Sequence, residues 1–158
     1  MARTENQRAL PLALFIAAVV LIVVRIVLTL MAGGAEAKGG GDLVQWLPPE
    51  SAAVAASTKP VLYDFTAAWC GPCRQLEADV YRNPELAAQI NARFTPVKVV
   101  DRRREDGANR AEVESLQERF RVEAFPTVVI VDGSGAAAAK MEGFRGADAF
   151  AQMLDSVR

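Results

Sequence analysis

Residues 61–73 read VLYDFTAAWCGPC, a short β-rich run that ends at small residues and then at two cysteines three positions apart. An apolar run of this length after Pro60 predicts a buried strand over 60–66. Pro72 suits the first turn of a helix, where its missing N–H group is not needed. The cysteines are therefore expected at a strand-to-helix junction.

A Cys-x-x-Cys pair at such a junction is typical of thiol–disulfide exchange. The unpaired N–H groups and the positive dipole end of the helix favour a thiolate on the first sulfur. We expect Cys70 to attack a substrate disulfide, and Cys73, one turn further on and partly buried, to resolve the mixed disulfide. Gly71 leaves room for a substrate backbone. Cys70 and Cys73 are thus predicted to form a redox-active disulfide.

The pair has two alternative uses: a zinc half-site shared between two chains, and a structural disulfide. Zinc usually takes four ligands, whereas this chain has two cysteines and no histidine. A bond across so short a loop restricts the unfolded chain very little. Both uses are disfavoured, and we expect neither a metal nor another cofactor.

Composition removes several classes of function. The absence of histidine excludes Ser-His and Cys-His nucleophile pairs and haem attachment through Cys-x-x-Cys-His. The formal net charge is −1, and no basic patch is interleaved with aromatic residues, so nucleic acid is not an expected partner. A chain of 158 residues, 51% of them hydrophobic, suits one domain with a core and an additional segment.

The rest of the globular part alternates between strand and helix patterns. A helix through Leu76 and Val80 is expected to break at Asn83-Pro84, an N-cap followed by proline, and a second helix to follow. Further strands are expected at 95–100, 126–131 and 138–144, a polar loop at 101–109, and helices through Val113, Leu116 and Phe120 and over 147–157. An edge strand is also expected at 43–47 and a first helix at 49–57. The pattern predicts an α/β domain whose mixed central sheet is flanked by helices on both faces.

Residues 9–32 are almost wholly apolar. At about 1.5 Å per residue such a helix reaches roughly 36 Å, enough to cross a hydrocarbon core of about 30 Å. Arg25 is the exception, and a snorkelling side chain is favoured over pairing with a partner helix. We predict a single transmembrane anchor after a short cytoplasmic N-terminus (1–8), a flexible linker at 33–42, and a globular domain over 43–158.

The charges that flank this segment predict its orientation. Arg3 and Arg8 precede it, whereas the stretch after it has only Lys38 against Glu36 and Asp42. The positive-inside rule then places the domain on the periplasmic or outer side of the inner (cytoplasmic) membrane. A cleaved signal peptide ending near 35–37 is the alternative, although its apolar region would be longer than the usual 7–15 residues or so.

Trp69-Cys70-Gly71-Pro72-Cys73 resembles the active-site motif of the thioredoxin family. Asp64 stands before it and Phe125-Pro126-Thr127 after it, in the order of that family, and the resemblance extends over 61–157. It implies a thioredoxin fold.

The resemblance also implies roles for individual residues. Asp64 would take the proton of Cys73, directly or through water, although it could instead be a strand-end aspartate in a turn. Pro126 would be the family's cis-proline, which meets an extended substrate, rather than a plain strand-start proline. Gly143 would lie beside the site, and Lys98 would lie near Asp64. The substrate-docking surface would comprise Trp69, Gly71, Pro72, Phe125, Pro126 and Thr127.

Some features depart from a small thioredoxin: Thr66, the late Pro84, and a charged run at 102–106 interpreted as a solvated loop. They resemble the C-terminal domain of the thiol-disulfide interchange protein DsbD. The predicted function is a thiol-disulfide oxidoreductase that reduces, or relays electrons to, disulfides of extracytoplasmic proteins. Since the span has no cysteine, an upstream thiol reductant protein must supply the electrons. The alternatives are a thiol oxidase or disulfide isomerase, and a redox-inert peptide-docking or chaperone module.

Overall fold

The computed structural model describes residues 19, 21–22 and 41–157, and those from 41 onward belong to one compact unit. The predicted cytoplasmic N-terminus (1–8), and nearly all of the predicted anchor (9–32) and linker (33–42), lie outside the described residues. Within the part of the chain that is described, no helix has the length and apolar character needed to cross a membrane.

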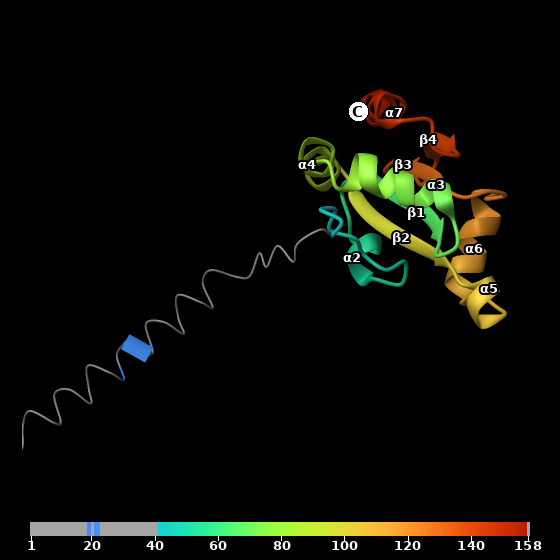
Figure 1. Ribbon diagram of the computed structural model, residues 1–158, viewed down its shortest axis with the longest axis horizontal. Helices are drawn as coiled ribbons and strands as arrows, with labels where there is room; N and C mark the ends of the chain where they lie inside the picture. The colour runs from blue at the N-terminus through green and yellow to red at the C-terminus, as the bar shows by residue number, and fades with distance from the viewer. Residues whose placement is uncertain (1–18, 20, 23–40, 158) are drawn as a thin grey trace, which may run out of the picture. The chain divides into compact units, whose positions relative to one another are not determined.

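Four strands form one mixed sheet in the order β2-β1-β3-β4 (Figure 1). The strands are β1 (Val61–Ala67), β2 (Thr95–Asp101), β3 (Thr127–Val131) and β4 (Ala137–Glu142). β1 runs parallel to β2 and antiparallel to β3, which in turn pairs antiparallel with β4. A central strand that is buried on both faces accounts for the nearly continuous apolar run in β1. The predicted mixed sheet is confirmed.

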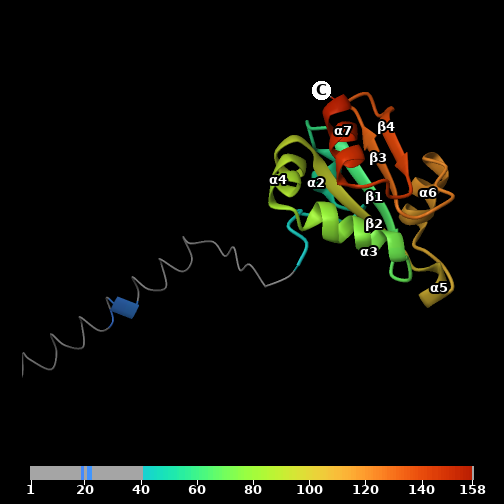
Figure 2. The same cartoon turned by 45° about the horizontal axis from the view of Figure 1, so that its top comes forward.

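Helices cover both faces of the sheet, as the sequence predicts (Figures 1 and 2). On one face lie α3 (Gly71–Leu76), its continuation η1 (Glu77–Tyr81), α4 (Pro84–Arg93) and α7 (Ala147–Ser156). On the other lie α6 (Ala111–Arg119) and the short α2 (Ala52–Ala55). Alternate strand residues divide between the two cores, because successive side chains of a strand point to opposite faces. Leu62 and Ile130 pack in the first core, and Phe65 and Val129 in the second.

The helix that starts at the cysteines ends where the sequence indicates. η1 is a π-helical turn in which Arg82 N–H donates to the Glu77 carbonyl over 3.0 Å. The Asn83 side chain then accepts hydrogen bonds from the N–H groups of Glu85 (2.9 Å) and Leu86 (3.3 Å). With Pro84 in the first turn, this is the predicted N-cap, a feature usually worth about 1 kcal/mol.

Two expectations are wrong, and a third element is present but shorter than expected. Residues 43–47 do not form a strand: only Leu47 makes a bridge, with Val97, because Pro48 and Pro49 follow and have no N–H group to extend the pairing. The helix expected over 49–57 is the single turn α2. The polar stretch 101–109 is not a plain loop, since it contains a helical turn, α5 (Arg103–Asp106), which ends at Gly107 with a φ of 80°.

The first core predicts the effect of truncating a leucine. Leu154→Ala removes a side chain that is 0% exposed, and it should lower the free energy of unfolding by about 2–5 kcal/mol, because a cavity remains. Leu43→Ala, at a side chain that is 46% exposed, is the matched control and should cost less than about 1 kcal/mol. Urea denaturation of the full-length chain in a neutral detergent measures both. Equal losses would contradict the assignment of this core.

Candidate active site

Cys70 and Cys73 form a disulfide at the N-terminus of α3, with an S–S distance of 2.09 Å and a Cα–Cα distance of 5.3 Å. Cys70 is the N-cap, with extended backbone (φ −79°, ψ 108°), and its Sγ accepts a hydrogen bond from Cys73 N–H over 3.1 Å. Sγ of Cys70 therefore lies where a helix offers unpaired N–H groups. Pro72 lies in the first turn.

Both cysteines are buried, Cys70 at 2% exposure and Cys73 at 7%. They form a small buried cluster with Ala67, and Phe125 packs against this cluster. Trp69, which is 41% exposed, meets Phe125 in an edge contact with 5.8 Å between ring centroids. This aromatic pair thus joins the disulfide cluster to a ring that is partly exposed to solvent.

The residues around Pro126 come together with the cysteines through Phe125. The Phe125–Pro126 peptide bond is cis. The carbonyl of Pro126 accepts a hydrogen bond from Gly143 N–H over 2.8 Å, which places Gly143 beside the site. Buried Thr127 donates from Oγ1 to the Ala124 carbonyl over 2.8 Å. The three residues 125–127, distant in sequence from the motif, thus join it at one end of the sheet.

Asp64 is 2% exposed, and its Oδ1 has no hydrogen-bond partner. Strand alternation puts it on the face that α3 and η1 cover, between Lys98 of β2 and Val128 of β3 in the register. Burial raises the pKa of Asp64 to about 7, and the positive charge of Lys98 opposes that rise without cancelling it. The carboxyl group can therefore exchange a proton near neutral pH.

Tyr81, at the end of η1, is a neighbour of Asp64 that the sequence did not reveal. Its hydroxyl is buried without a hydrogen-bond partner, and burial followed by the charge of Asp64 holds the pKa of Tyr81 well above its usual value. The two groups are close enough to influence each other, yet no hydrogen bond of proper geometry joins them. The only sequence signal was an aromatic residue directly after the apolar helix position Val80.

Lys98 links this buried acid to the segment before the sheet. Its Nζ lies 3.1 Å from Asp42 Oδ2 and over the rings of Trp46 (5.0 Å to the centroid) and Tyr81 (5.8 Å). Trp46 Nε1–H also donates to Asp42. A hollow of about 320 Å³ is lined by both Cys73 and Lys98. The hollow therefore joins Cys73 to the lysine that lies opposite Asp64 in the strand register. Asp42 and Trp46 were also missed by the sequence analysis.

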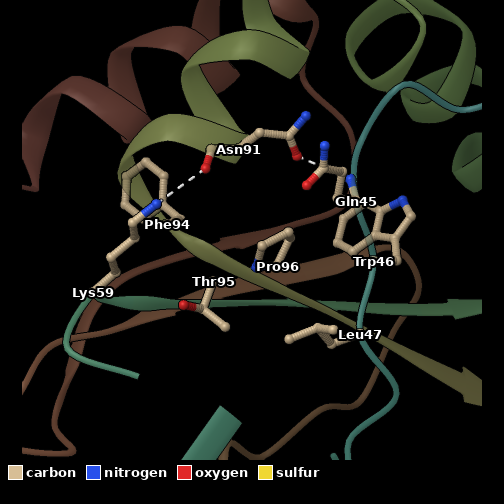
Figure 3. A pocket seen from close by; sticks show the side chains of 8 residues that line it. All are labelled: Gln45, Trp46, Leu47, Lys59, Asn91, Phe94, Thr95 and Pro96. Atoms are coloured by element: carbon tan, nitrogen blue, oxygen red, sulfur yellow. Dashed lines mark hydrogen bonds between the residues drawn. The ribbon is translucent and has the colours of Figure 1, made fainter. Parts of the chain in front are cut away.

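A second pocket, of about 350 Å³, lies between the segment 45–47, α4 and the start of β2 (Figure 3). Asn91 holds it together: its Oδ1 accepts from Gln45 N–H (2.9 Å) and its carbonyl from Lys59 Nζ (3.3 Å). Its lining has no cysteine or carboxylate, and Thr95 within it pairs with the first residue of β1, at the strand end away from the motif. This pocket is not part of the cysteine site. In the described part of the chain, no three potential metal ligands cluster together.

A disulfide at the N-terminus of a helix, a buried acid on the sheet face that this helix covers, and a cis-proline that follows Phe125 together define a thiol-disulfide oxidoreductase site. Residues 47–158 match the family described as Thioredoxin-like domain, and the chain belongs to this family. It is 32% identical over 95 residues to Thioredoxin-1 of Drosophila melanogaster, covering 60% of this chain and 73% of that one.

Other relatives are exchange proteins. The chain is 32% identical over 114 residues to the thiol:disulfide interchange protein DsbD of Yersinia pestis, covering 70% of this chain but only 18% of that relative's length. The reduced C-terminal domain of Neisseria meningitidis DsbD superposes with a TM-score of 0.54 at 26% identity, over 71% of this chain and all of that domain (100%). The protein is thus a thioredoxin-like thiol-disulfide oxidoreductase.

The buried acid predicts how stability depends on pH. The ordinary pKa of the carboxyl is 3.8, against about 7 in the folded protein. Its contribution to stability is therefore fully present below pH 3.8 and is lost as pH rises through 7. From pH 4 to pH 8, wild type should lose up to about 4 kcal/mol through this group, and Asp64→Asn should not.

Denaturant titrations of the oxidised protein at several pH values measure this difference. Asp79→Asn, at an exposed carboxylate in η1, controls for the loss of a negative charge on that face. If the difference in the free energy of unfolding between Asp64→Asn and wild type stays constant from pH 4 to pH 8, the raised pKa of Asp64 is contradicted.

Proposed function

We propose that this protein is a membrane-anchored reductase that passes electrons from a thiol protein to disulfides of proteins outside the cytoplasm. The observation that carries the proposal is the Cys70–Cys73 disulfide at the start of α3, the helix that covers the sheet face on which buried Asp64 lies. Gly71-Pro72 between the cysteines and the likeness to DsbD favour reduction over oxidation as the direction.

In the first step, the Cys70 thiolate of the reduced protein attacks one sulfur of a substrate disulfide. A bond forms between Cys70 Sγ and that sulfur, the substrate S–S bond breaks, and the second substrate sulfur leaves as a thiolate. The N–H groups at the start of α3 stabilise the attacking thiolate. The substrate strand docks in extended form along Phe125-Pro126-Thr127, with Trp69, Gly71 and Pro72 around it.

In the second step, Cys73 loses its thiol proton and attacks Cys70 Sγ. The intramolecular disulfide forms, the mixed disulfide breaks, and the first substrate sulfur leaves as a thiolate, so that two electrons have passed to the substrate. Asp64 acts as the base, directly or through water in the hollow that Cys73 and Lys98 share. A pKa near 7 suits this role, because the carboxylate can accept a proton and release it again.

The sequence supports a location outside the cytoplasm. Residues 9–32 would anchor the chain in the inner membrane, with 1–8 in the cytoplasm, and 33–42 would tether the domain on the periplasmic or outer side. The only cysteines are Cys70 and Cys73, so the anchor cannot carry electrons. Regeneration of the dithiol therefore requires a second protein that has a reduced thiol pair.

The direction of electron flow is tested by the equilibrium reduction potential of the Cys70–Cys73 couple. We expect a value near that of thioredoxin, about −270 mV, because a donor must have a lower reduction potential than the disulfides that it reduces. Equilibration of the full-length chain with glutathione buffers, with alkylation and mass analysis, measures it. A value near about −120 mV would instead make the protein a thiol oxidase.

Partner trapping tests the proposed order of the cysteines. Cys73→Ala should accumulate a mixed disulfide between Cys70 and its substrates, because the resolving thiol is missing. Cys70→Ser should accumulate none. Non-reducing gels and mass spectrometry of membrane fractions measure both. If Cys70→Ser retained full function, a redox-inert docking or chaperone module would replace the enzyme.

A further inference from the structure

Two guanidinium groups flank the cysteines. Arg104, in α5, has its Cζ 3.6 Å from the centre of the Trp69 ring. Arg74, in α3, donates from Nη1 to the Ala68 carbonyl over 3.3 Å, and its Nη2 lies 3.9 Å from where a Cβ on Gly71 would stand. Both side chains are exposed. Each therefore lies over the chain directly next to Cys70.

Neither group is neutralised within the described part of the chain. Other charges near the motif are paired locally: Arg102 with Asp106 (2.5 Å), Arg103 with Glu114 (3.3 Å), and Glu77 with Arg82 (2.8 Å). Arg74 and Arg104 have no carboxylate within 4.0 Å among the described residues. Glu77 lines the same hollow as Arg74, but its carboxylate is engaged by Arg82.

Hydrogen bonds to a buried carboxylate hold the helical turn that carries Arg104. Buried Asp101, the last residue of β2, accepts hydrogen bonds from Arg103 N–H (3.1 Å), Asn109 Nδ2 (2.6 Å) and Gln117 Nε2 (2.9 Å). Burial alone would raise the pKa of Asp101, but these hydrogen bonds outweigh it and hold the pKa below its ordinary value. These hydrogen bonds fix the position of α5, from which Arg104 stacks on Trp69.

We propose that Arg74 and Arg104 form a cationic rim that selects protein disulfides flanked by acidic residues. The inference rests on the proposed reductase function and names the chemistry of its substrates. A guanidinium stacked on an indole keeps the N–H donors at its edge free, and two such donors match a carboxylate. Exposed charges of this kind act mainly by speeding encounter with an oppositely charged partner, and salt screens them.

The test uses the reduced full-length chain in a neutral detergent and three synthetic peptides. Each peptide holds one intramolecular disulfide, and the residues beside the attacked cysteine are Glu, Gln or Lys. The second-order rate constant of reduction is divided by the rate with dithiothreitol, which corrects for the intrinsic reactivity of each disulfide. We expect the Glu peptide to react about tenfold faster than the Lys peptide at low ionic strength, and the ratio to approach one at about 0.5 M salt.

Variants locate the effect. Arg74→Gln combined with Arg104→Gln should bring the ratio of the Glu-peptide rate to the Lys-peptide rate close to one at low salt. The corresponding double Lys variant should keep most of the preference for the Glu peptide. The matched control is Lys59→Gln with Arg119→Gln, which makes the same change in net charge. Both control residues line a hollow at the strand end away from the motif, and the control should keep the wild-type ratio.

The outcomes separate the two proposals. Equal rates for the three peptides with wild type, or the same loss of preference in the rim and control variants, would overturn the cationic rim and leave the reductase function standing. If wild type reduces none of the peptides although its dithiol is intact, the proposed reductase function fails. Near-ultraviolet circular dichroism of each oxidised variant checks that its fold is retained.

Discussion

Burial of β1 on both faces is the constraint on which the site depends. β1 pairs with β2 on one side and with β3 on the other, and these pairings fix its backbone. Because α3 begins shortly after the end of β1, the cysteines are placed at the start of that helix. The same alternation that puts Phe65 into one core puts Asp64 into the other, under α3 and η1. One strand therefore positions both the disulfide and the acid beside it.

The buried acid is costly for stability and useful for proton transfer. An ionised carboxylate without a hydrogen-bond partner at Oδ1 is disfavoured inside a protein, so the carboxyl keeps its proton to higher pH. The positive charge of Lys98 opposes this rise in the pKa of Asp64. Because the Lys98 ammonium also pairs with Asp42, it stabilises ionised Asp64 less. Asp42, which precedes the sheet, thus helps to keep the pKa of Asp64 near neutral pH.

Sequence patterns worked well where a single element explains the residues. The Asn83-Pro84 break follows from local capping, and the buried strands follow from runs too apolar to face water. They failed where contacts with residues distant in the sequence determine the local structure. Residues 43–47 have strand-like composition, but only Leu47 meets β2, and the segment is held mainly by Asn91 and Tyr81. The turn α5 exists because Asp101 and Asn109 bind its backbone, which no helical periodicity announces.

By itself, the sequence determined the α/β class, the strand-to-helix junction at the cysteines and the chemistry of a dithiol, because these follow from local periodicity and from the spacing of two sulfurs. Only the tertiary structure decided that Phe125 packs against the cysteine cluster, that Tyr81 borders Asp64, and that Arg104 stacks on Trp69. These contacts join residues far apart along the chain. Their strength depends on burial and on distances of a few ångströms, and the fold alone sets both.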